Sequence, residues 1–309
     1  MLRLRADMLR RLREFFHQGG FLEVETPILS ADTVVDRHID PFSLSLARDR
    51  RLWLQTSPEF AMKRLLATSD SPGAIYQVSR VFRQDELGPL HNPEFTLVEW
   101  YRLHDTLDDG MKWTSDLCEA MLGRGPARRI SYAEAFRQYV GLDPHTAPIG
   151  ELMAAARAQS SQPPQSLSIE DRDGWLDWLL VERVQPRLGV DCPAILFDYP
   201  ASQAALARVR HDNPPVAERF ELYVSGIELA NGYHELLDAE ELRRRNALVN
   251  AQRQADGKPP LPEQSRLLAA MDAGLPPAVG VALGFDRLVM LAAKAASIGE
   301  VMAFTFDRA

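Results

Sequence analysis

Three side chains between residues 82 and 101 together suit a phosphorylated ligand that carries an amine. Arg83 offers a planar cation that pairs well with phosphate oxygens, and Phe95 offers a flat ring on which a base can stack. Glu99 adds an anion that can bind an ammonium group. These groups indicate a site for a nucleotide beside an amine, provided that the local structure aligns them.

The residues around a short loop predict a β-hairpin that does align them. Residues 75–83 and 95–101 are rich in β-branched and aromatic side chains, and the glycine, prolines and asparagine between them favour a loop. Because side chains alternate along a strand, Phe95 and Glu99 share one face roughly 13 Å apart. That length suits a nucleotide joined to an amino acid, with Arg83 on the phosphate. The alternative is an ordinary hairpin with an exposed arginine and a structural glutamate.

A pair of acids lies in residues 219–229, which predict two short strands about a turn at Val224-Ser225. This symmetry sets Glu221 opposite Glu228, and like charges that face each other across a strand pair are destabilising. A Mg²⁺ ion between them would reverse the sign of that interaction, since magnesium prefers hard oxygen ligands beside phosphates. The alternative is two solvated acids on a hairpin.

Residues 280–291 predict a strand of small residues that runs into an apolar helix, with Arg287 near the helix start. Glycines in this strand allow a ligand to approach the backbone closely. Packing explains most such segments when they occur alone. The three segments in this order carry more weight together.

The chain resembles the class II aminoacyl-tRNA synthetases, in the lysyl branch, at the three sequence motifs that mark this class. Motif 1 corresponds to residues 20–27, motif 2 to residues 83–99 and motif 3 to the stretch that ends at Arg287. The resemblance covers nearly the whole chain. Within this branch the chain is most similar to stand-alone ligases that attach a lysine, in practice β-lysine, to elongation factor P. Residues 91–95, 200–203 and 226–232 carry that closer similarity.

The resemblance implies an ATP site built from all three motifs. Arg83 contacts the α-phosphate, and Phe95 and Arg287 sandwich the adenine, while Arg287 also reaches the γ-phosphate. His91 helps to hold the outer phosphates. The remaining implied ATP-site residues are Asp85 at the adenine amino group and the Mg²⁺ ligands Glu221 and Glu228.

The resemblance also implies a pocket for lysine or β-lysine. Glu99 and Glu235 hold the ε-ammonium, and Glu59 holds the other amino group. Tyr101 and Tyr233 form the walls of the pocket, and Asn231 binds the substrate carboxylate. The substrate carboxylate attacks the α-phosphorus, pyrophosphate leaves, and an amine captures the acyl-adenylate. Positioning and charge stabilisation supply the catalysis, so no covalent enzyme intermediate is expected.

Four positions depart from the pattern of lysyl-tRNA synthetases. Asp85 replaces a glutamate, which predicts a longer or water-mediated contact to adenine, and Leu90 replaces an arginine and so removes a phosphate contact. Ser57 and Ala282 replace alanine and glycine, as in the elongation factor P ligases. Since the amino group of β-lysine lies one bond away from its place in lysine, about 1.5 Å, these two residues are expected to favour β-lysine.

Two other functions remain open at this stage. One is a truncated lysyl-tRNA synthetase-like enzyme that charges tRNA or another small acceptor, and the other is a non-catalytic regulatory protein that binds an amino acid. About twenty residues precede Phe21, too few for an anticodon-binding domain. The formal charge of −8 also lacks the basic character typical of nucleic-acid binding. Anticodon recognition is therefore not expected.

The motifs predict one α+β catalytic domain over residues 1–309, an antiparallel sheet flanked by helices, with a helical insertion at about 145–190. A homodimer is expected through motif 1, with Pro27 near the two-fold contact. The first helix is predicted to bury Leu2, Leu9, Leu12 and Phe16. No apolar run is long enough for a membrane span, and two cysteines are too few for a disulfide framework, which favours a cytoplasmic protein.

Overall fold

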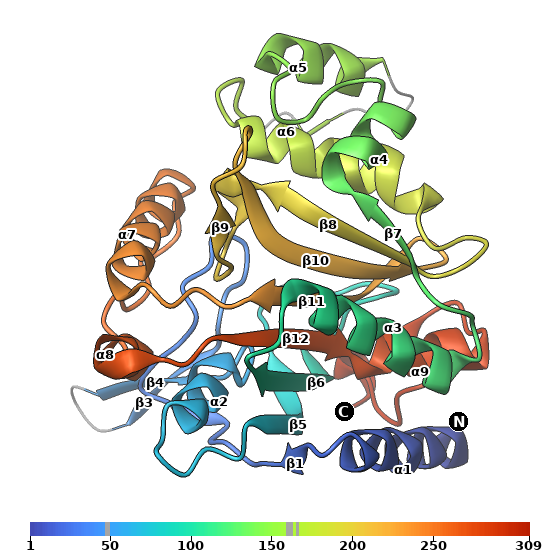
Figure 1. Ribbon diagram of the computed structural model, residues 1–309, viewed down its shortest axis with the longest axis vertical. Coiled ribbons are helices and arrows are strands. Elements are labelled where there is room, and N and C mark those ends of the chain that lie inside the picture. The colour runs from blue at the N-terminus through green and yellow to red at the C-terminus, as the bar shows by residue number, and fades with distance from the viewer. Residues whose placement is uncertain (47–49, 159–162, 165–166) are drawn as a thin grey trace. The chain divides into compact units, whose positions relative to one another are not determined.

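The computed structural model describes residues 1–46, 50–158, 163–164 and 167–309, and it divides into two compact units (Figure 1). The first unit combines Met1–Thr106 with Glu235–Ala309, and the second is Leu107–His234. Each unit combines a β-sheet with helices, which confirms the predicted α+β class. None of the helices in these described ranges combines the length and apolar character that a membrane span requires.

The first unit contains four adjacent strands of a sheet and a small separate sheet. The four strands lie in the order β1 (Leu22–Glu23), β5 (Ala74–Phe82), β6 (Glu94–Leu103) and β12 (Ala278–Gly284). The pairs β5–β6 and β6–β12 are antiparallel, as predicted, but β1 pairs with β5 in parallel. The small sheet has the order β2 (Leu29–Ser30), β4 (Arg50–Leu54) and β3 (Ser43–Leu46).

Helices of the first unit pack on these strands and on one another. They are α1 (Leu2–Gln18), α2 (Glu59–Leu66), α7 (Ala239–Ala255), α8 (Arg266–Gly274) and α9 (Phe285–Ala293), with the short turns η4 (Ile298–Glu300) and η5 (Phe306–Arg308). Both α2 and α9 contact β6, the strand that carries Phe95 and Glu99. The central strand is thus fixed by two helices that themselves bear predicted site residues.

The first helix buries a different set of residues from the one predicted. Met8, Leu12 and Phe16 are buried at a spacing of four, which repeats along one face of a helix, whereas Leu2 is exposed. Leu12 and Phe16 were predicted correctly, but Leu2 lies in the first turn, before the face meets the sheet. Phe16 stacks on Tyr76 of β5 with the ring centroids 4.4 Å apart.

The second unit has its own set of paired strands. Their order is β11 (Ile227–His234), β10 (Val216–Val224), β8 (Ala194–Pro200) and β7 (Arg128–Ser131), and β9 (Val209–Arg210) also pairs with β10. The inner pairs are antiparallel, and β7 runs parallel to β8. Its helical elements are α3 (Leu107–Leu122), α4 (Tyr132–Tyr139), α5 (Ile149–Arg157), α6 (Arg172–Leu179), η1 (Leu180–Val184), η2 (Gln185–Arg187) and η3 (Ala201–Gln203). Helices α5 and α6 lie side by side, and α4 packs on β8 (Figure 1).

Candidate active site

The predicted hairpin is present as β5, a loop and β6. Phe82 pairs with Glu94 and Val78 with Val98, so the antiparallel register continues to the mouth of the loop. Beyond β5, the amide of Arg83 donates to the carbonyl of Pro93 at 2.9 Å, which closes the loop at its base. The hairpin therefore places Arg83 beside the start of the strand that carries Phe95 and Glu99.

Arg83 and Phe95 lie against each other in the structure. The guanidinium carbon of Arg83 is 5.0 Å from the centroid of the Phe95 ring. Two long hydrogen bonds of 3.3 Å, to the Thr56 carbonyl and the Glu86 carboxylate, also hold the guanidinium. The predicted phosphate ligand thus covers the ring that is predicted to stack on adenine. Asp85, two residues further on, is exposed and has a positive φ of 60°, which aspartate tolerates better than most residues.

Arg287 lies in the first turn of α9 and reaches the same loop. Its Nη2 is 2.8 Å from Nε2 of His91, and its Nε donates to the Leu90 carbonyl at 3.3 Å. An arginine can only donate, so Nε2 of His91 is the acceptor and the imidazole is neutral. Burial and then the charge of Arg287 lower the pKa of His91, in agreement with a neutral ring. Motif 2 and motif 3 thereby meet at His91.

A buried aspartate that the sequence analysis missed links these two motifs. Asp286 accepts a 2.7 Å hydrogen bond from the Thr96 amide on one oxygen and a 2.5 Å bond from Arg5 of α1 on the other. Arg5 also donates to the Thr96 hydroxyl at 2.7 Å. Since Thr96 follows Phe95 and Asp286 precedes Arg287, this arrangement fixes the two predicted adenine contacts. An acid next to Arg287 in an otherwise apolar helix was the available signal.

The first unit also brings together three buried carboxylates, those of Glu59, Glu99 and Glu235, which we call the acid cluster. Glu99 is 2% exposed and accepts hydrogen bonds from Ser57 Oγ at 2.7 Å and from the Tyr101 hydroxyl at 2.5 Å. Glu59 begins helix α2, and Glu235 follows directly after β11. Three like charges without water would be costly, so the cluster is suited to a ligand that carries positive charge.

Burial raises the pKa of two acids of this cluster, Glu99 and Glu235. Burial and then the charge of Glu59 raise the pKa of Glu99 to about 7. Burial also raises the pKa of Glu235 to about 8, although the charge of Lys63 partly opposes this. Such shifts are common at functional sites. Glu99 and Glu235 therefore retain protons near neutral pH, and a bound cation would displace them.

Lys63 of α2 is a second residue that the sequence analysis missed. Its Nζ lies 2.5 Å from Oε1 of Glu59, one helical turn earlier, and also contacts Oε2 of Glu235. The only signal was the spacing of four between Glu59 and Lys63, which usually marks a solvated pair on a helix surface. Here the lysine side chain is 3% exposed.

Strand β12 provides the space that the acid cluster needs. A Cβ atom on Gly280 would lie 2.2 Å from Oε1 of Glu235 and 2.2 Å from the Tyr101 ring, so only glycine fits there. Ala282 pairs with Glu99 in the register of β6 and β12. Two of the four residues that depart from the synthetase pattern, Ser57 and Ala282, therefore adjoin Glu99.

The acids of the second unit are arranged differently from the prediction. The turn falls at Ser225-Gly226, and Glu221 pairs with Asn231 rather than with Glu228. The prediction was wrong because the turn falls one residue later than expected, which sets Tyr223 opposite Glu228; a β-bulge between Leu222 and Tyr223 then brings Asn231 opposite Glu221. Since opposed residues share a face and Glu221 and Tyr223 are two apart, Glu228 still lies on the face of Glu221.

Glu221 is already surrounded by donors within the second unit. Arg219 contacts Oε1, and the hydroxyls of Tyr199 and Tyr223 both donate to Oε2, the former at 2.5 Å. The Arg219 guanidinium also lies over the Tyr199 ring at 4.4 Å. Glu221 is thus the partner of a mostly buried cation.

The other two predicted residues of the second unit lie on β11. Asn231 donates from Nδ2 to the Tyr233 hydroxyl at 3.3 Å. Within the described structure its Oδ1 is buried without a hydrogen-bond partner. Asn231 therefore has one polar atom to offer to a ligand.

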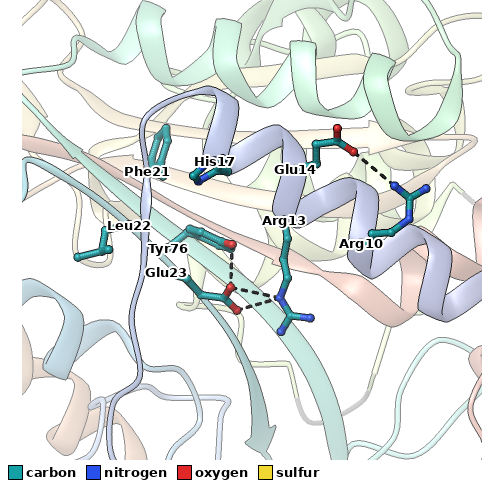
Figure 2. A pocket seen from close by; sticks show the side chains of 8 residues that line it. All are labelled: Arg10, Arg13, Glu14, His17, Phe21, Leu22, Glu23 and Tyr76. Carbon is teal, nitrogen blue, oxygen red and sulfur yellow. Dashed lines mark hydrogen bonds and ion pairs between the residues drawn. The ribbon is translucent and has the colours of Figure 1, made fainter.

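A shallow pocket of the first unit lies elsewhere, on the motif 1 segment (Figure 2). Its centre is Glu23, whose carboxylate accepts from the Tyr76 hydroxyl at 2.9 Å and from Arg13 Nε at 3.0 Å. Figure 2 shows both donors pointing at that carboxylate. The remaining lining residues are Arg10, Glu14, His17, Phe21 and Leu22. No residue predicted to bind ATP or substrate lines this pocket.

Comparison with known proteins places the chain among tRNA synthetase-like enzymes. A model of the family described as tRNA synthetases class II (D, K and N) matches residues 1–308. The elongation factor P (R)-β-lysine ligase of Haemophilus influenzae is 45% identical over 310 residues, covering 99% of this chain and 94% of that protein. The ligases of the same name from Mannheimia succiniciproducens and Klebsiella pneumoniae are 46% and 45% identical with the same coverage.

Proposed function

This chain belongs to the class II tRNA synthetases (D, K and N), and from that premise we propose that it activates (R)-β-lysine with ATP and transfers it to a lysine side chain of elongation factor P. The observation that carries the proposal is the acid cluster, which suits a substrate with ammonium groups at both ends. The names of the relatives point to the same substrate and acceptor. A translation-related reaction of this kind takes place in the cytoplasm.

ATP binding requires one rearrangement of the present structure. Adenine is proposed to stack between Phe95 and Arg287, but the Arg83 guanidinium covers the Phe95 ring. Its hydrogen bonds to Thr56 and Glu86 are long, at 3.3 Å, so it can move at small cost to the α-phosphate. His91 already faces Arg287, and a ring nitrogen that carries a proton would donate to the outer phosphates.

The proposed reaction is an in-line attack of the substrate carboxylate on the α-phosphorus. Pyrophosphate leaves, and the acyl-adenylate is then attacked by the amine of the acceptor lysine, which releases AMP. Arg83 and Arg287 stabilise the charge that develops on the phosphates. Glu99 and Glu235 hold the substrate ammonium, with Glu59 at the second amino group, so that the carboxylate is placed for attack.

We propose that the enzyme prefers the β isomer because of the residues around Glu99. Ser57 donates to its Oε2, and Ala282 lies beside it on the neighbouring strand. A hydroxyl and a methyl group at these positions reshape the corner around this acid. Apolar differences of this size discriminate by about 1–3 kcal/mol, so measurable activity with α-lysine is expected as well.

Mg²⁺ is expected to bind together with ATP. Glu221 and Glu228 of the second unit are its proposed carboxylate ligands. Among the described residues no group of three or more His, Cys, Asp or Glu side chains is placed to hold a metal ion, so the protein would supply one or two carboxylates and the phosphates the rest. Glu228 fits this mode. Glu221 fits it less well, because Arg219 and two phenols occupy its oxygens. When bound, the ion would neutralise phosphate charge.

A homodimer through motif 1 remains part of the proposal. Leu22, Ile28 and Leu29 of this segment are apolar and 54%, 44% and 41% exposed. An apolar exposed segment of this kind favours a protein contact. Light scattering after size exclusion should give about twice the 34.7 kDa mass of the chain.

The decisive experiment is the intact mass of purified elongation factor P after incubation with this protein, ATP, magnesium and either lysine isomer. A mass gain of one lysyl group, larger with (R)-β-lysine, is expected, with no charging of lysine tRNA in parallel. Charging of tRNA without a protein adduct would overturn the proposed acceptor.

A further inference from the structure

Lys63 is a buried cation that none of the roles above uses. It lies on α2, where its Nζ is 2.5 Å from Glu59 Oε1 and contacts Glu235 Oε2. Burial by itself lowers the pKa of Lys63, but the charges of Glu235 and Glu59 outweigh burial and raise the pKa above its usual value. The amine is therefore protonated, and it belongs to the acid cluster.

The charges of the cluster can be counted. Three carboxylates and the Lys63 ammonium leave a formal charge of −2 when all four groups are ionised. The charges that act on Glu99 are those of Glu59 and Lys63, and the charges that act on Glu235 are those of Lys63, Glu59 and Glu99. Lysine and β-lysine each carry two ammonium groups, whose combined charge of +2 balances the formal charge of the cluster.

The same contacts also orient the carboxylates. Lys63 holds one oxygen of Glu235, and the other oxygen lies over Gly280, where a Cβ atom would be 2.2 Å away. Glu99 is held differently, by the hydroxyls of Ser57 and Tyr101, so no lysine neutralises it by direct contact in the described structure. An incoming ammonium group would therefore meet Glu99 as the acid with the most negative charge to offer.

We propose that Lys63 is a positioning residue and a counter-ion within the pocket. Its positive charge leaves the ionised acid cluster with a net charge of −2, and this net charge selects a substrate with two ammonium groups. This inference rests on the proposed function. Without Lys63, the repulsion between Glu59 and Glu235 would be uncompensated and the pKa of Glu235 would rise further, because like charges in a buried site cannot all ionise. A protonated acid no longer attracts an ammonium group.

The test compares Lys63→Met and Lys63→Arg with wild type in lysine-dependent ATP–pyrophosphate exchange, using both lysine isomers. For Lys63→Met we expect the KM for lysine to rise about 30-fold or more and the KM for ATP to stay within about threefold. The ammonium ion should enter the space left by Nζ and lower the KM for lysine again, whereas tetramethylammonium at equal ionic strength should not. Lys112→Met is the matched control, since Lys112 also pairs with an acid four residues away, Asp116, but is exposed.

Lys63→Arg keeps the charge and tests the role in positioning even if Lys63→Met does not fold. A planar guanidinium cannot place two carboxylates as a single ammonium does, so we expect the KM for lysine to rise about fivefold or more. A normal KM for lysine in Lys63→Arg, or in a folded Lys63→Met, would overturn the inference and leave a purely structural ion pair. Absence of lysine-dependent exchange in wild type would instead overturn the proposed function.

Discussion

The hydroxyl of Ser57 donates a 2.7 Å hydrogen bond to Oε2 of Glu99, so a residue that departs from the synthetase pattern touches the acid proposed to bind the substrate ammonium. This bond stabilises the ionised form of Glu99 and lowers its pKa, against the larger effects of burial and the Glu59 charge. Ser57 is therefore expected to affect both the preference for β-lysine and the protonation state of Glu99.

Replacing Ser57 by alanine should shift the pH dependence of lysine activation. In wild type, kcat/KM for lysine should rise as pH increases through about 7, the pKa of Glu99, because only the ionised acid attracts an ammonium group. The groups that face Glu99 are Glu59 and Lys63 on α2, Tyr101 on β6 and Glu235 after β11. Loss of a hydrogen bond to the carboxylate raises the pKa, so the profile of Ser57→Ala should move about one pH unit higher.

Pyrophosphate exchange between about pH 6 and pH 9 measures this shift. Ser202→Ala is the control, since Ser202 donates a similar 2.7 Å bond to Asp173 outside the acid cluster. An unchanged profile in Ser57→Ala would show that Glu99 does not control lysine binding.

Replacing Phe95 by alanine should weaken ATP binding. Stacking of a base on an aromatic ring contributes about 1–3 kcal/mol, which corresponds to a rise in the KM for ATP of roughly 5- to 100-fold. Phe95→Trp keeps a ring and should retain most of the affinity. Phe304→Ala is a matched control, because Phe304 is 69% exposed. Equal KM values for ATP in Phe95→Ala and wild type would remove Phe95 from the adenine site.

The parts of this site that follow from local periodicity were predictable from the sequence. Alternation along residues 95–101 places Phe95 and Glu99 on one face whatever the rest of the fold does, and the structure agrees. The pairing of Glu221 was not predictable in the same way, because it depends on which two residues form the turn and on one bulge, and neither leaves a mark in the alternation. Symmetry about an assumed turn therefore gave the wrong partner.

The two buried charges that the sequence analysis missed have a different cause. Lys63 and Asp286 lie on helices, where a charged residue is normally expected to face water. Their burial depends on partners distant in the chain, Glu235 for Lys63 and Thr96 with Arg5 for Asp286. No pattern of neighbouring residues encodes those contacts.

Replacing Gly280 by alanine should impair lysine binding more than ATP binding. The new methyl group would lie 2.2 Å from both Glu235 Oε1 and the Tyr101 ring, so one of these must move. Forcing extra volume into a packed site typically costs about 1–3 kcal/mol, and we expect a corresponding rise in the KM for lysine. Gly284→Ala in the same strand is the control, because its nearest contact would be an ordinary 3.6 Å. Similar KM values for lysine in the two variants would argue against a pocket at Gly280.

Replacing Glu221 and Glu228 separately by glutamine should separate a structural acid from a magnesium ligand. Glu221→Gln leaves Arg219 without its anionic partner, and breaking a buried ion pair typically costs about 3–5 kcal/mol, so urea unfolding should show a clear loss of stability. Glu228→Gln should raise the Mg²⁺ concentration needed for half-maximal exchange.

Each variant replaces one carboxylate group by an amide on the same face of the hairpin, so each serves as the control for the other. An equal rise in the Mg²⁺ requirement for both would restore Glu221 as a metal ligand, since a carboxylate has lone pairs beyond those that Arg219, Tyr199 and Tyr223 occupy. A rise confined to Glu228→Gln, with destabilisation confined to Glu221→Gln, would assign the metal to Glu228. The turn at Ser225-Gly226 would then matter to the site, because it sets Glu228 opposite Tyr223 and thereby on the same face as Glu221.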